Sequence, residues 1–130
     1  MLYEDADMTR KVKIKWLKSS SDKDFDAARR FLEILYGARR AKRYVARLKD
    51  APICEYLAKD ILRASGTSLL ELQAFDWTKQ HDEIRNGTPL SPILLIRREK
   101  ANRIVVADGF HRLCASFTFD EQSEVRCLIA

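Results

Sequence analysis

Between residues 22 and 49, apolar residues recur every three or four positions, which is the spacing of an amphipathic helix. The apolar stripe consists of Phe31, Leu35, Ala38, Ala41, Val45 and Leu48. Residues 19–22, Ser-Ser-Ser-Asp, come directly before this stripe and supply N-cap side chains. Gly37 interrupts the stripe, and a glycine inside a helix lowers its stability. We therefore predict a helix over residues 22–49, with Gly37 as the place where it could break.

Two further segments flank this helix. Residues 11–17 alternate basic and apolar side chains, a pattern that predicts a half-buried edge strand. Pro52 suits the first turn of a second helix, and Gly66 suits its end. The apolar residues that would share one face of this second helix are Ile53, Leu57, Ile61 and Leu62. Residues 68–76 are ambiguous between a short helix and an irregular apolar segment.

The C-terminal part of the chain predicts most of the strands. Residues 77–86 are expected to form a short helix that Gly87 ends. The apolar runs 93–96 and 104–107 predict the two strands of a hairpin, both buried on their two faces. Residues 109–119 then predict a helix, and residues 125–129 predict a last strand.

This order of elements predicts an α+β domain with a small mixed β-sheet and an N-terminal helical portion. A chain of 130 residues can bury one hydrophobic core but hardly two. We therefore expect a single domain over residues 1–130, made of an N-terminal strand and helical portion (1–76) and a C-terminal core (77–130). No internal repeat or low-complexity segment divides it.

Bulk composition excludes some classes of protein. No apolar run approaches the roughly 18 residues that a membrane helix needs, so no membrane partner is expected. The acidic N-terminus lacks the basic and apolar regions of a signal peptide, which predicts a cytoplasmic location. Cys54, Cys114 and Cys127 lie far apart without a Cys-x-x-Cys pair, so free buried thiols are expected rather than a disulfide framework.

The most suggestive chemistry lies at the turn from the strand 104–107 into the helix 109–119. The first N–H groups of a helix lack intrahelical partners and can bind phosphate or carboxylate. Gly109 would let a ligand come close, and His111 and Arg112 could donate hydrogen bonds to phosphate oxygens. Asp108 is instead well placed to cap the helix by accepting from the N–H of Phe110 or His111. A cap alone, a cap beside a ligand pocket and a catalytic Asp108 all stay open.

Residues 77–130 resemble the ParB/sulfiredoxin superfamily, often labelled the ParB-like nuclease domain. The matching segments, in the family's order, are Ile84–Gly87, Leu90–Ile96, Val105–Asp108, Gly109–Ala115 and Glu124–Cys127. The chain is also similar to a group of small bacterial proteins with the motifs K-D-I-x-R-A-S, L-S-P-x-L-L-I-R and A-D-G-F/Y-H-R. The resemblance implies a ParB/sulfiredoxin-like core around the 108–112 turn.

The departures from this family concern the reactive position. The sulfiredoxin motif resembles G-C-H-R, and the motif of partition-type ParB proteins, which helps to hold a cytidine triphosphate, resembles G-E-R-R. Phe110 stands here at the position of the cysteine or the glutamate. Neither the sulfiredoxin reaction nor centromere binding is therefore implied, and the chain has no acidic cluster of the kind that nucleases use with two metals. An anion-accepting turn with Arg112 beside it is what the resemblance still implies.

The leading hypothesis is consequently the binding of a nucleotide or another phosphorylated small molecule at the 108–112 turn. The expected ligand-binding residues are Asp108, Gly109, His111, Arg112, Lys59, Asp60 and Arg63. Lys59 and Arg63 would complete a phosphate clamp, or Asp60 and Arg63 would simply pair on the surface of their helix. If the protein is an enzyme, His111 is the acid or base candidate. A nucleotide is the sole cofactor that this hypothesis suggests.

The alternative is a nucleic-acid or protein interaction module that uses the basic segment 29–49. This segment carries eight basic residues against one acid, Glu33. The residues expected to contact nucleic acid are Arg39, Arg40, Arg43 and Arg47, and Tyr36 and Tyr44 could stack on bases. A charged helix face that is merely solvated explains the same pattern. No metal site is expected, because His81 and His111 have no carboxylate or cysteine at ligand spacing.

Overall fold

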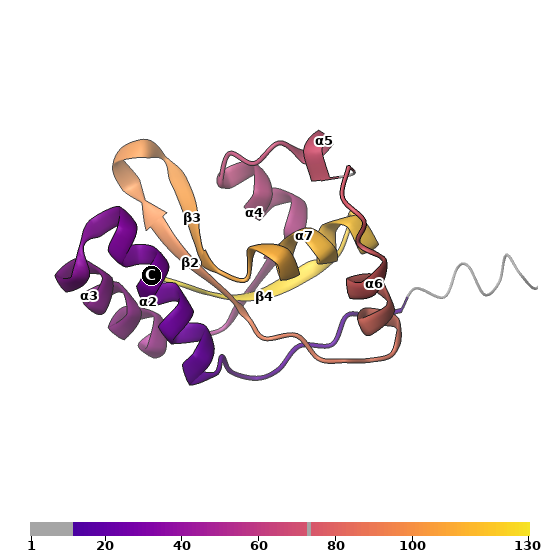
Figure 1. The fold of residues 1–130 in the computed structure, drawn as a ribbon, viewed down its shortest axis with the longest axis horizontal. Coiled ribbons are helices and arrows are strands. Elements are labelled where there is room, and N and C mark those ends of the chain that lie inside the picture. The colour runs from indigo at the N-terminus through magenta and orange to yellow at the C-terminus, as the bar shows by residue number, and fades with distance from the viewer. Residues whose placement is uncertain (1–11, 73) are drawn as a thin grey trace, which may run out of the picture.

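The computed structural model describes residues 12–72 and 74–130 (Figure 1). Its helices are α2 (Asp22–Tyr36), α3 (Ala38–Asp50), α4 (Ala58–Ala64), α5 (Leu69–Leu72), α6 (Thr78–Arg85), the 3-10 turn η1 (Glu99–Ala101) and α7 (Phe110–Phe119). Its strands are β1 (Cys54–Leu57), β2 (Ile93–Arg98), β3 (Arg103–Asp108) and β4 (Glu124–Ile129). The predicted α+β class with a small mixed sheet is confirmed.

The four strands form one sheet in the order β1-β4-β2-β3. β1 pairs with β4 and β2 pairs with β3 in antiparallel fashion, whereas β2 and β4 run parallel. The predicted hairpin of the two apolar runs is thus confirmed as β2 and β3. Burial of both strands on both faces is wrong for β3, which lies at the edge of the sheet and is only partly buried. The other neighbour of β2 is β4, which α7 connects to β3.

Helices cover both faces of this sheet, with α2 and α3 on one side and α4 and α7 on the other (Figure 1). Leu94 and Ile96 point to the first layer, and Ile93 and Leu95 point to the second. All four side chains are fully buried, and burial of each stabilises the fold by about 1.5–3 kcal/mol. This two-sided burial explains why β2 reads as a continuous apolar run instead of an alternating one.

The predicted helix over 22–49 breaks at Gly37 into α2 and α3. Gly37 adopts φ 85° and ψ 164°, a conformation that is essentially restricted to glycine. Ser21 caps α2 by accepting from the N–H of Asp24, and the Asp24 side chain accepts from the N–H of Ser21 in return. α3 packs back against α2 and buries Ala41, Val45 and Leu48, as the predicted stripe requires. The part of the stripe before the break is wrong: Phe31, Leu35 and Ala38 are exposed, and α2 buries Ala28 and Leu32 instead, because the break at Gly37 turns the two helices independently.

Two of the predicted elements differ in the structure. Residues 54–57 form β1 instead of the start of a helix, because β4 supplies hydrogen-bond partners that local spacing cannot reveal. The predicted strand 11–17 is reduced to a bridge between Trp16 and Leu90, and residue 11 lies outside the described part. No helix within residues 12–72 and 74–130 has the length and apolar character needed to cross a membrane.

Candidate functional site

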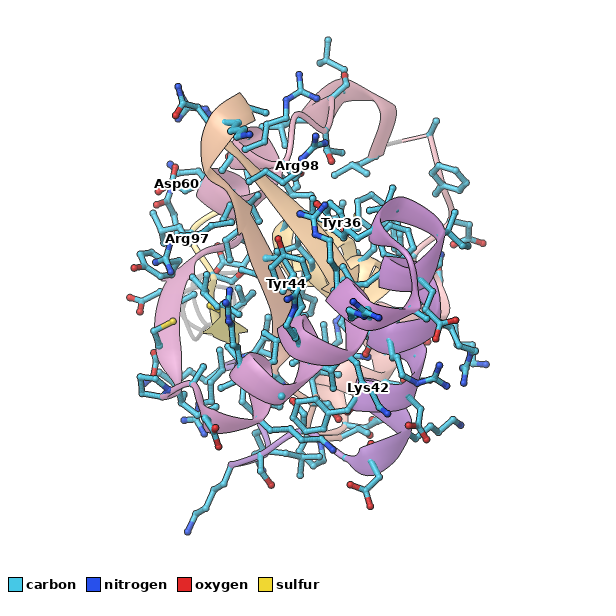
Figure 2. The ribbon with its side chains drawn as sticks, turned by 90° about the vertical axis from the view of Figure 1, so that its left-hand side faces the viewer. Tyr36, Lys42, Tyr44, Asp60, Arg97 and Arg98 are labelled. Atoms are coloured by element: carbon cyan, nitrogen blue, oxygen red, sulfur yellow. The ribbon has the colours of Figure 1, made fainter. Side chains whose placement is uncertain are left out.

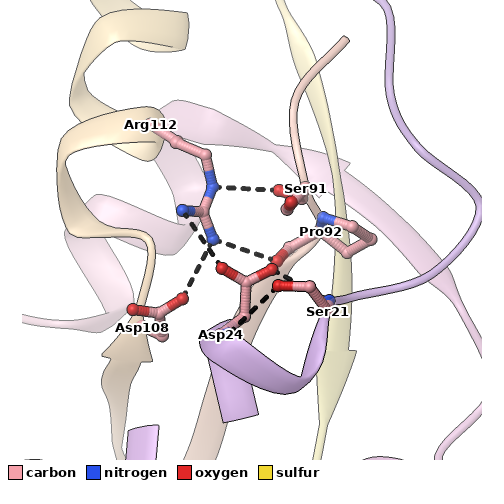
Figure 3. Close-up of polar contacts among 6 residues, drawn as sticks. All are labelled: Ser21, Asp24, Ser91, Pro92, Asp108 and Arg112. Atoms are coloured by element: carbon pink, nitrogen blue, oxygen red, sulfur yellow. Dashed lines mark hydrogen bonds and ion pairs between the residues drawn. The ribbon is translucent and has the colours of Figure 1, made fainter. Parts of the chain in front are cut away.

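Arg112 is the centre of a polar network at the turn between β3 and α7 (Figure 3). β3 ends at Asp108, Gly109 turns the chain with φ 95° and ψ 20°, and α7 begins at Phe110. The Arg112 guanidinium donates to the carbonyl oxygens of Ser91 (3.0 Å) and Pro92 (3.3 Å). It also donates to Asp108 Oδ2 at 3.2 Å. Arg112 therefore fixes the segment that leads into β2 against the start of α7.

Asp24 brings α2 into the same network. Its Oδ1 lies 4.0 Å from Nη1 of Arg112, and the side chains of both residues are mostly buried. The capping box with Ser21 holds the Asp24 carboxylate in place. One guanidinium thus joins α2, the approach to β2 and the first turn of α7.

The two carboxyl groups beside Arg112 have opposite pKa shifts. Burial alone would raise the pKa of Asp24, but the backbone N–H of Ser21 and the charge of Arg112 outweigh it and lower that pKa below its ordinary value. Burial raises the pKa of Asp108, and the charge and hydrogen bond of Arg112 offset this only in part. The single charge of Arg112 is therefore shared between Asp24 and Asp108, and it does not fully offset the burial of Asp108.

The predicted capping role of Asp108 is wrong. Gly109 occupies the N-cap position of α7, and no side chain makes a capping hydrogen bond there. The Asp108 carboxylate is directed to Arg112 instead, because the guanidinium supplies both a hydrogen-bond donor and a full positive charge. A phosphate at this turn would lie beside two carboxylates, so the local charge does not favour an anion.

The other predicted ligand residues do not join this network. Arg63 forms an ion pair with Asp60 (3.6 Å) on the exposed face of α4, as in the surface-pair interpretation. Within the described chain, no hydrogen bond or ion pair links Lys59, Asp60 or Arg63 to the 108–112 turn. His111 is exposed at the start of α7, with its ring 6.4 Å from that of Trp77.

A second candidate site lies between the α2–α3 hairpin and the end of β2, whereas Arg112 contacts the segment that leads into the start of β2. It is a cleft of about 520 Å³ that we call the basic–aromatic cleft. Its lining residues are Tyr36, Arg40, Tyr44, Arg47, Arg97, Arg98, Lys100 and Ala130. Figure 2 shows Tyr36 and Tyr44 in front of the β2–β3 ribbon, whereas Lys42 projects from α3 away from them.

The aromatic part of this cleft consists of two tyrosine rings, and an arginine packs against them. The rings of Tyr36 and Tyr44 have centroids 5.2 Å apart, because the break at Gly37 folds α3 back beside α2. The Arg40 guanidinium lies 4.6 Å from the Tyr36 ring centroid and donates to the Tyr44 hydroxyl at 3.3 Å. The Tyr36 hydroxyl is buried and has no hydrogen-bond partner among the described residues.

The cleft is strongly cationic. Five of its lining side chains are basic, and none of the lining side chains that the structure describes is acidic. A smaller hollow of about 240 Å³ adjoins it and is lined by Arg40, Arg43, Tyr44 and Arg47. Such a concentration of one sign of charge in a concave surface attracts anions.

Sequence reasoning found one side of this cleft and missed the other. Of the predicted nucleic-acid residues, Arg40 and Arg47 line the cleft and Arg43 lines the adjoining hollow, whereas Arg39 is exposed outside both. Arg97, Arg98 and Lys100 were not predicted as site residues. In the sequence, these three residues form a basic run at the end of the buried strand β2, and this run could have marked them as candidates. Their position opposite α3 could not be predicted, because it depends on how the sheet packs against the helices.

Within the described part of the chain, no group of three or more histidine, cysteine, aspartate or glutamate side chains is arranged to hold a metal ion. Comparisons of the chain with protein-family models, with curated proteins and with solved structures found no match.

Proposed function

We propose that the protein binds a single-stranded nucleic acid in the basic–aromatic cleft. The observation that carries this proposal is the Tyr36–Arg40–Tyr44 cluster inside a rim of basic side chains, with no acidic side chain among the described lining residues. Arginines neutralise phosphates, and the faces of tyrosine rings stack on bases of any sequence. The cleft therefore offers both kinds of contact that a nucleic-acid strand requires.

A single strand fits this arrangement better than a duplex. The tyrosine rings lie within a cleft, so only an unpaired base that is turned out of its stack can reach them. Arg43 and Arg47 continue the positive surface into the adjoining hollow, which gives a path for the phosphates of neighbouring nucleotides. The ligand that this surface suits is consequently a chain of nucleotides rather than one isolated phosphate.

The 108–112 turn is a weaker place for a phosphorylated ligand. Arg112, the cation expected to neutralise the phosphate, already contacts two carboxylates and two backbone carbonyls. In the basic–aromatic cleft, by contrast, Arg97, Arg98 and Lys100 form no ion pair with a described residue. Free cations gain more from an anionic ligand than a cation that must leave its partners.

The test is a fluorescence anisotropy titration of labelled single-stranded RNA and DNA at several salt concentrations. The double variant Arg47→Glu/Arg98→Glu should weaken binding at least about tenfold and reduce the slope of log K against log salt by about two. The matched control is Arg63→Glu/Arg85→Glu, which changes the net charge equally at exposed residues outside the cleft. Equal losses in both variants, or no binding of the wild type at low salt, would exclude the cleft.

The aromatic contact has its own test. Tyr44→Ala should weaken single-strand binding by about 1–3 kcal/mol, because one base loses its stacking surface. Competition with unlabelled duplex distinguishes the two forms of ligand. A duplex that competes as well as a single strand of the same sequence would contradict the stacking contact, even if the basic residues matter.

A further inference from the structure

Cys54 and Cys127 face each other across the pair of strands at one edge of the sheet. The register of β1 and β4 places Cys54 directly opposite Cys127. Their sulfur atoms lie 3.6 Å apart, and each thiol also lies within 3.4–3.6 Å of the other residue's carbonyl oxygen. Both thiols are free, with Cys127 buried and Cys54 partly exposed on the outermost strand.

We propose that Cys54 and Cys127 are a thiol modification site that closes to a reversible disulfide between β1 and β4. Directly opposed residues of antiparallel strands have Cα atoms about 4.5–5.5 Å apart, which lies within the range that disulfides require. The sulfur atoms need only approach from 3.6 Å to about 2.05 Å, a change that side-chain rotation can supply. The backbone pairing therefore already holds the two thiols in the geometry of the product.

A small disulfide such as oxidised glutathione would be the oxidant. The partly exposed Cys54 loses its proton and its thiolate attacks one sulfur of the oxidant, which releases the first glutathione thiolate and leaves a mixed disulfide. The Cys127 thiolate then attacks the Cys54 sulfur and releases the second glutathione thiolate. The two protons lost by the cysteines end on the two glutathione thiols, so the protein is oxidised by two electrons and the oxidant is reduced by two.

The surroundings explain the order of these steps. Burial raises the pKa of Cys127, and the neighbouring Cys54 raises it further, so Cys127 suits the second, intramolecular attack rather than the first. Arg97 and Glu55 are the charged groups that act on the Cys127 thiol from β2 and β1, in opposite directions. Cys114 is buried in α7, where burial raises its pKa to about 11, so it should stay reduced.

The experiment treats the native full-length protein with oxidised glutathione, blocks the remaining thiols under denaturing conditions and maps the tryptic peptides by mass spectrometry. The expected product is the peptide 50–59 joined to the peptide 127–130, lighter by two hydrogen atoms than their sum. Cys114, in the peptide 113–126, should carry the blocking group. Closure should be faster as the pH rises, and dithiothreitol should reverse it.

Two controls separate native pairing from chance. Cys114→Ala should leave the cross-link unchanged, and oxidation in urea should give additional pairs that contain Cys114. The oxidised native protein should also unfold at a temperature several degrees higher, because the bond closes a long loop in the unfolded chain. A native protein that yields only glutathione adducts, three blocked thiols or pairs with Cys114 would overturn the proposal.

Discussion

Asp24 and Arg112 lie 4.0 Å apart, one in the first helix after the N-terminal segment and the other in the last helix of the chain. Their ion pair connects the α2–α3 hairpin to the turn that the sequence marks as the most suggestive site. The same turn therefore has a clear role in holding the fold together. Its arginine connects three elements, which favours a structural interpretation of the Asp-Gly-Phe-His-Arg motif.

Replacement of Arg112 by methionine should lower the free energy of unfolding by about 2–4 kcal/mol. The change removes a cation from between two largely buried carboxylates and leaves two carbonyls without their donor. Urea denaturation measures the loss. Arg85→Met is the matched control, since its ion pair with Asp82 is exposed and should contribute less than about 1 kcal/mol.

Asp24→Asn should produce a stability deficit that depends on pH. The pKa of Asp24 is lowered in the folded protein, so its ionised form stabilises the fold above the pKa of the unfolded state, near 4. The deficit relative to wild type should be about 1–2 kcal/mol at pH 7 and shrink as the pH falls below 4 through the folded pKa. Urea denaturation at pH 7, 5, 4 and 3.5 tests this, and a deficit independent of pH would contradict the ion pair.

Gly109→Ala should destabilise the protein by more than about 2 kcal/mol. Gly109 has φ 95°, and an added Cβ would lie 2.7 Å from Nη2 of Arg112 and 2.9 Å from the Ile93 side chain. Gly87→Ala provides the comparison, because Gly87 also has positive φ but meets only the flexible end of Lys15. Its cost should stay near 1 kcal/mol in the same thermal or urea measurement. Similar losses in both variants would show that the crowding around Arg112 is unimportant.

Tyr36→Phe should raise the free energy of unfolding by about 0.5–1 kcal/mol. The substitution removes a buried hydroxyl that has no partner among the described residues, while the ring keeps its contacts with Tyr44 and Arg40. Tyr44→Phe should have the opposite sign, because the Tyr44 hydroxyl accepts a hydrogen bond from Arg40. Affinity for a single strand should fall in Tyr36→Phe if the hydroxyl contacts the ligand, so the two measurements together separate stability from binding.

The elements predicted well are those that local spacing or an unbroken apolar run marks clearly, namely the α3 part of the helical stripe, the β2–β3 hairpin and the helix α7. The buried face of α2 was predicted wrongly, because the corner at Gly37 turns Phe31 and Leu35 to the surface and Ala28 and Leu32 to the core. β1 was missed because it is four residues long and gains its structure from β4, which follows about seventy positions later in the chain. The prediction of a strand over 11–17 was wrong for the opposite reason. The alternating pattern is present, but no long strand lies beside it, so the structure has only the bridge between Trp16 and Leu90.

The candidate sites were only partly predictable, because each combines residues that lie far apart in the sequence. A helix pattern could identify Arg40 and Arg47, because both lie on one basic segment. It could not place Arg97 or Arg98 opposite them, since that depends on the packing of α3 against β2. The pairing of Cys54 with Cys127 depends likewise on strand register, and the spacing of cysteines along the chain gives no sign of it.

The corner at Gly37 has a consequence for how the protein would respond to its ligand. In one continuous helix, Tyr36 and Tyr44 would be separated by about 12 Å along the axis, whereas the corner brings their rings to 5.2 Å. The paired tyrosine rings of the cleft thus exist only while α2 and α3 are folded against each other. A strand that binds there would protect the amides of α2 and α3 from hydrogen exchange, and the protection would grow with ligand concentration.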